Sequence, residues 1–154
     1  MTNEKGLTLA QMVLLIVVVL IVLVVMVPQI LHYITDSETG SFISSAQFYV
    51  DEVRKHLTLT QGFPVDQDDS VPFRILDLDL DKKKQKSVYG NNWVSEKSYV
   101  ISKNIGTMED PVYSYSIALQ DEEGYCLELT DETVLKRASV KRNECNIINF
   151  DDIQ

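Results

Sequence analysis

The N-terminal part of the chain contains a long segment without charge. Residues 7–33 include no Asp, Glu, Lys or Arg, and most of them are Val, Leu or Ile. Val and Ile favour strands in water, but a single segment in lipid must satisfy its own backbone hydrogen bonds as a helix. At about 1.5 Å per residue, a helix of this length crosses a hydrocarbon core of about 30 Å. The pattern therefore predicts a transmembrane helix over residues 7–33.

Apolar residues continue beyond this segment at helical spacing. They recur at intervals of three and four, with a polar interruption over residues 36–41: Ile30, Leu31, Ile34, Phe42, Ala46, Tyr49, Val50, Val53 and Leu57. This spacing predicts an amphipathic helix that continues the first one and ends near Leu59. Gly40 weakens a helix by about 1 kcal/mol relative to Ala, so a local break is possible there.

The remaining chain shows the alternation of apolar and polar residues that is typical of strands. Strands are expected over residues 72–81, 99–103, 112–119 and 125–129. The acidic turn at residues 121–124 connects the last two strands as a hairpin. A helix followed by an antiparallel sheet predicts an α+β head.

A short leader precedes the apolar segment. Lys5 and Gly6 stand directly before Leu7, Thr8 and Leu9. This arrangement resembles the type IV pilin and pseudopilin family, whose leaders end in Lys-Gly or Arg-Gly followed by Phe-Thr-Leu-Ile-Glu and a hydrophobic helix. The resemblance implies that a prepilin peptidase cuts between Gly6 and Leu7 and methylates the new N-terminus. Leu7 replaces the usual Phe.

Two further positions bear on this resemblance. Pro28, the twenty-second residue after the implied cut, stands where many pilins carry a proline that bends the long helix. Gln11, the fifth residue, departs from the family, which has a glutamate there that is thought to pair with a neighbouring subunit's N-terminal ammonium. Glutamine forms hydrogen bonds but cannot neutralise that charge. An unpaired cation in an apolar assembly core costs several kcal/mol, which points to a minor or tip subunit.

Other side chains suggest no catalytic chemistry. The two cysteines, Cys126 and Cys145, are expected to form a disulfide, and by resemblance they would bound the C-terminal region of a pilin head; two free buried thiols are the alternative. Trp93 is either a core residue or a binding anchor. No phosphate-binding loop or nucleophile elbow occurs, so we expect no enzyme activity and no cofactor.

The only candidate metal ligands are three aspartates at two-residue spacing. Asp77, Asp79 and Asp81 offer oxygen ligands of the kind that Ca²⁺ prefers, and some pseudopilins bind Ca²⁺. Lys82 stands where a Ca²⁺ loop needs glycine. A solvated strand face with neighbouring lysines is the alternative, and it is the one we favour.

Charge and order along the chain lead to one overall expectation. The net charge of −9 belongs to the part beyond His32, because Glu4 and Lys5 cancel, and an acidic head argues against nucleic acid as a partner. We expect a leader at residues 1–6, an assembly helix at 7–33 and an extracytoplasmic head at 34–154. The expected function is a structural subunit of a pilus-like, secretion or competence filament, first held in the cytoplasmic membrane and then assembled at the cell surface or in the periplasm. Its partners would be other subunits and the peptidase. The alternative is an uncleaved, membrane-anchored sensor or ligand-binding domain.

Overall fold

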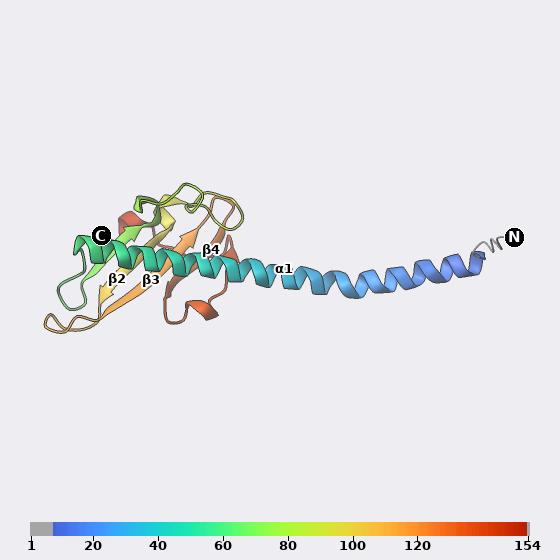
Figure 1. Cartoon of the computed structure of the whole chain (residues 1–154), viewed down its shortest axis with the longest axis horizontal. Coiled ribbons are helices and arrows are strands. Elements are labelled where there is room, and N and C mark those ends of the chain that lie inside the picture. Colours follow the sequence, from blue (N-terminus) through green and yellow to red (C-terminus); the bar gives the residue numbers. More distant parts are fainter. Residues whose placement is uncertain (1–7, 154) are drawn as a thin grey trace. The chain divides into compact units, whose positions relative to one another are not determined.

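The computed structural model describes residues 8–153, with the side chains of residues 27–37 left out. The chain forms two compact units, Met1–Glu38 and Thr39–Gln154. The long helix α1 (Leu9–Thr60) belongs to both, and all the strands belong to the second, which we call the head. Figure 1 shows the later part of α1 lying along one face of the head's sheet. The structure thus confirms the predicted α+β fold, with an apolar helix that continues into an amphipathic one.

Helix α1 continues through the predicted weak point and ends where expected. Its backbone is helical at Gly40, so the predicted local break is absent; the carbonyl of Gly40 accepts a hydrogen bond from the Ser44 hydroxyl. After Thr60, Gln61 takes a left-handed conformation with φ of 53°, and the N–H of Gly62 bonds the carbonyl of Leu57. These are the features of a Schellman cap, which satisfies carbonyls that the helix end leaves open.

The head contains one sheet of five antiparallel strands in sequential order. They are β1 (Ser70–Arg74), β2 (Tyr99–Asn104), β3 (Tyr113–Gln120), β4 (Tyr125–Asp131) and β5 (Lys141–Arg142). The predictions for β2, β3 and β4 are confirmed within two residues at each end. Pro72 is compatible with β1 because this strand lies at the edge of the sheet.

The strand predicted over residues 72–81 is wrong for most of its length. β1 ends at Arg74, and Ile75–Asp77 forms a 3-10 helix in which the N–H of Leu78 bonds the carbonyl of Ile75. The reason lies in the partner strand. β2 begins at Tyr99, which pairs with Arg74, so no strand stands opposite the residues that follow. The chain therefore turns inward and buries Ile75 and Leu78.

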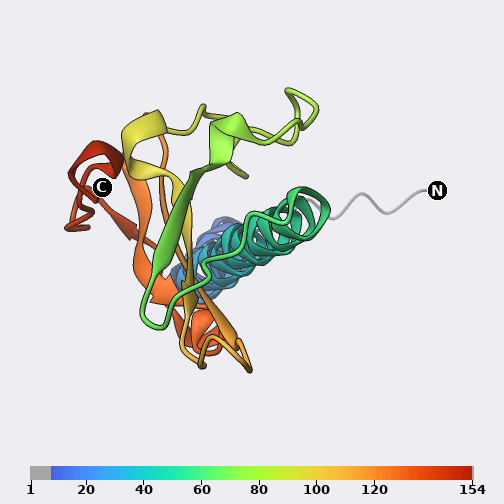
Figure 2. The same ribbon diagram turned by 90° about the vertical axis from the view of Figure 1, so that its left-hand side faces the viewer.

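The two faces of the sheet are covered by different parts of the chain. One face packs against α1, and the apolar helix residues predicted from Phe42 onward form this core with the sheet: Phe42, Ala46, Tyr49, Val50, Val53, Leu57, Tyr115, Ile117, Leu119 and Leu127. Ile30, Leu31 and Ile34 lie among the residues whose side chains are not described. The opposite face carries a smaller cluster of Tyr99, Ala118, Cys126, Ile147 and Phe150. Figure 2 shows the C-terminal segment on the side of the sheet away from the helix.

Candidate functional site

The predicted assembly helix begins with a reciprocal cap. The backbone N–H of Thr8 donates to Gln11 Oε1 at 3.0 Å, and the N–H of Gln11 lies 3.4 Å from Thr8 Oγ. Thr8 and Gln11 are therefore arranged as a capping box, in which two otherwise unpaired backbone donors are satisfied. This capping role was not among the predictions from the sequence, although Thr-x-x-Gln before an apolar run is its known signature. A glutamate at position 11 would accept the same bond.

The helix that follows is apolar on every side. Leu9–Met26 is long and apolar enough to cross a membrane, and none of it is buried within the structure. Its large side chains expose between 43% and 84% of their surface. A helix that is apolar all round must be covered by lipid or by other helices. The length and composition of this helix therefore support the prediction of a membrane-spanning segment.

Three of the predicted site residues are described only in part or not at all. The implied cut between Gly6 and Leu7 lies outside the described residues. Pro28 lies within the helical backbone of α1, among the residues whose side chains are not described. The bend predicted at Pro28 stays a prediction.

The head is anchored to α1 by polar contacts as well as by its core. The Trp93 indole N–H donates to Tyr49 Oη at 2.8 Å, and the Tyr49 hydroxyl donates to the carbonyl of Lys84. Burial raises the pKa of Tyr49, and the hydrogen bond from Trp93 opposes this in part. Trp93 is thus a core residue, which was one of the two predicted alternatives. It joins the helix to the loop that precedes β2.

Arg54 forms a second anchor between the helix and the sheet. Its guanidinium contacts the carboxylate of Glu132 after β4 and lies 4.6 Å from the centre of the Tyr115 ring on β3. It also contacts Asp51 on the same helix at 2.8 Å. The planar guanidinium suits such combined pairing and stacking. These contacts hold the amphipathic part of α1 in one register on the sheet.

The β3–β4 hairpin is organised by a buried carboxyl group that was not predicted from the sequence. Asp121 is fully buried; its Oδ2 accepts from the Ser87 hydroxyl at 2.8 Å and from Asn91 Nδ2 at 3.1 Å. Its Oδ1 accepts from the backbone N–H groups of Glu123 and Tyr125. Four donors therefore surround one carboxyl group, as burial of a polar group requires. This network ties the long loop before β2 to the hairpin.

The predicted disulfide is present. Cys126 on β4 is bonded to Cys145, 19 residues later, and the enclosed segment includes β5. Cys126 packs with Ile147 and Phe150 in the smaller core cluster. The bond therefore fixes the C-terminal segment to the face of the sheet that α1 does not cover.

The three aspartates do not form a metal site. Asp77 ends the 3-10 helix, Asp79 and Asp81 follow in irregular chain, and all three side chains are exposed. Among the described residues, no group of three or more His, Cys, Asp and Glu side chains is close enough to hold a metal ion. The two-residue spacing produces a common face only on a strand, and the strand ends before these residues.

Comparison with models of protein families, with curated proteins and with solved structures finds no match for this chain.

Proposed function

We propose that this chain is a structural subunit, minor or at the tip, of a type IV pilus-like or type II secretion-like filament. The observation that carries the proposal is the apolar helix Leu9–Met26, none of which is buried within the structure, joined through α1 to a small α+β head. The Lys5-Gly6 leader ending supports cleavage after Gly6 by a prepilin peptidase. The helix lies first in the cytoplasmic membrane, with the head outside, and then in the filament core among the helices of other subunits.

The same helix is compatible with simple anchoring, so processing distinguishes the two functions. A filament subunit requires removal of residues 1–6 before assembly. A retained leader in a host that has the peptidase would favour an uncleaved, membrane-anchored sensor or binding domain.

The minor or tip position rests on Gln11. Substitution Gln11→Glu keeps an acceptor for the Thr8 N–H and adds the charge that could neutralise a neighbour's N-terminal ammonium. We expect this variant to be incorporated at more positions along the filament shaft than the wild type. Immunogold labelling of filaments from the native host measures this distribution.

The matched control is Gln11→Ala, which removes the Gln11 side-chain half of the capping box, keeps the Thr8 half and adds no charge. It should lower helix stability by less than about 1 kcal/mol and give no gain in shaft incorporation. If Gln11→Glu labels the shaft no more than wild type does, the charge argument for a minor position is wrong. Cleavage after Gly6 is tested independently of this result.

A further inference from the structure

A basic groove lies beside the first turns of α1 within the head. It has a volume of about 460 Å³, and no carboxylate lines it. We call it the lysine groove, and its wall includes Ser44, Ser45, Phe48, Lys83, Lys84 and Lys86. Among the described residues, none of these lysines forms an ion pair, and Lys84 Nζ lies 5.7 Å from the centre of the Phe48 ring. The groove therefore offers free positive charge beside an apolar surface.

A second surface of the head has the opposite character. Val65, Met108 and Pro111 line a hollow of about 270 Å³, and Val65 and Met108 expose 65% and 64% of their surface. The two loops that meet here also carry exposed carboxylates without an ion pair in the described part of the chain. We call this surface the acidic end: Val65, Asp66, Asp69, Met108, Glu109 and Asp110. Asp68 is not included, because it already pairs with Lys103 at 2.9 Å.

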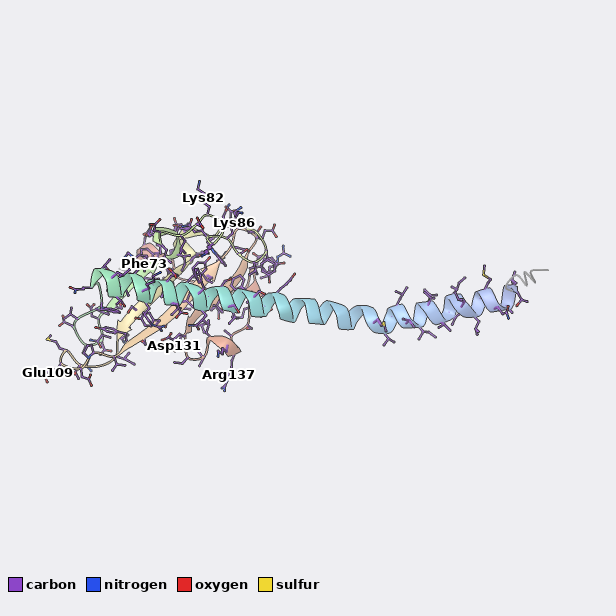
Figure 3. The ribbon with its side chains drawn as sticks, viewed as in Figure 1. Phe73, Lys82, Lys86, Glu109, Asp131 and Arg137 are labelled. Carbon is purple, nitrogen blue, oxygen red and sulfur yellow. A yellow bond between two sulfur atoms is a disulfide. The ribbon has the colours of Figure 1, made fainter. Side chains whose placement is uncertain are left out.

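The two surfaces lie at different levels of the head. The lysine groove adjoins Ser44 of α1, whereas the hollow at the acidic end adjoins Thr58. Fourteen residues of helix separate these positions by about 21 Å along the axis. Figure 3 shows Glu109 at the extreme end of the head, far from Lys82 and Lys86. One molecule therefore cannot satisfy its own groove with its own acidic end.

We propose that the lysine groove of one copy receives the acidic end of a second copy, head to tail. The chain carries a net charge of −9, so two heads repel each other in most orientations. Lys82, Lys83, Lys84 and Lys86 are four of its 14 basic residues, and they lie within five positions. Contact at this groove replaces repulsion by attraction, and the apolar side chains Met108 and Val65 meet Phe48 and Val88.

This contact joins different surfaces of the two copies, so it is heterologous and can be repeated. It involves the head alone. It is independent of Gln11, and it can be correct whether or not the leader is cleaved. A subunit that stacks poorly through its apolar helix would thereby still pair with a second copy.

Charge reversal in the full chain tests the pairing. One variant carries Lys83→Glu and Lys86→Glu, and a second carries Asp66→Lys and Asp69→Lys; all four side chains are exposed. Each is kept in detergent micelles at no more than one chain per micelle, and sedimentation equilibrium measures association. We expect the wild type to associate reversibly and each variant to associate at least about tenfold more weakly. An equimolar mixture of the two variants should regain wild-type association, because each groove then faces an end of opposite charge.

The control for the lysine variant is Lys136→Glu with Arg137→Glu, which makes the same charge change as that variant on exposed side chains elsewhere on the head. The apolar helix is the same in all these chains and lies in separate micelles, so only contacts between heads produce a difference. Raising the salt to about 1 M should weaken the wild-type pair, since exposed charges are screened. A monomeric wild type, equal weakening by the control variant, or no recovery in the mixture would overturn the proposal.

Discussion

Asp121 offers the sharpest test of how the head is held together. Its carboxylate is fully buried and accepts four hydrogen bonds, two from side chains of the loop before β2 and two from the β3–β4 turn. Gly124, the residue directly before β4, has a φ of 89°, and its carbonyl accepts a hydrogen bond from the N–H of Asn143. The carboxylate therefore supports a turn on which both the loop and β5 depend.

Substitution Asp121→Ala removes the acceptor and leaves four donors in a buried site. A buried donor without a partner costs about 1–3 kcal/mol, and water can reach part of the turn because Glu122 and Glu123 are exposed. We therefore expect a loss of about 3–5 kcal/mol in the free energy of unfolding, below the sum of the four separate costs. Asp121→Asn keeps the shape and one acceptor oxygen, so its expected loss is about 1–2 kcal/mol.

Urea unfolding of the full chain in micelles measures both values. Trp93 is the only tryptophan and is buried in the head, so its fluorescence reports on head unfolding without a contribution from the apolar helix. Glu144→Ala, which removes an exposed carboxylate near the same turn, is the control and should change stability by less than about 0.5 kcal/mol. A loss below about 1 kcal/mol for Asp121→Ala would refute the claim that this network organises the head.

Two further predictions concern the C-terminal region. Replacing Cys126 and Cys145 by serine should lower the unfolding free energy by about 3 kcal/mol, because the bond closes a short loop in the unfolded chain; equal midpoints with and without reductant in the wild type would contradict this. The pKa of Glu128 lies below its ordinary value of 4.5, because the carboxylate accepts the N–H of Asn146 and lies beside Lys141. The stabilisation of the head by ionised Glu128 is therefore present at neutral pH and is lost as the pH falls through this lowered pKa. Glu128→Gln should melt below wild type at pH 7 and together with it at strongly acidic pH, and a gap that persists in acid would contradict this assignment.

Much of the fold follows from the periodicity of the sequence. The apolar spacing from Phe42 to Leu57 predicts the buried face of α1, because a helix places residues three and four apart on one side. Alternation predicts β2, β3 and β4 for the same kind of reason. At residues 75–81 alternation fails as a guide, since a strand also needs a partner, and β2 begins too late in the chain to supply one.

The functional features of the chain could be predicted only where residues close together in the sequence indicate them. The apolar helix and the paired cysteines are visible in the sequence itself. The capping role of Gln11 has a local signature as well, in Thr8 three residues before it. Asp121, in contrast, lies in an acidic run that reads as a solvated turn, and its partners Ser87 and Asn91 lie about 30 residues away in sequence. The lysine groove likewise depends on a loop that packs beside α1, and no pattern in the sequence predicts this packing.

The intact mass of the protein from its native host would show whether this chain is processed as a filament subunit. We predict a mass that lacks residues 1–6, carries one added methyl group, and is two hydrogens lighter without reductant than after reduction. A mass that includes an intact leader, from a host with an active prepilin peptidase, would contradict the filament function and leave an anchored domain in its place.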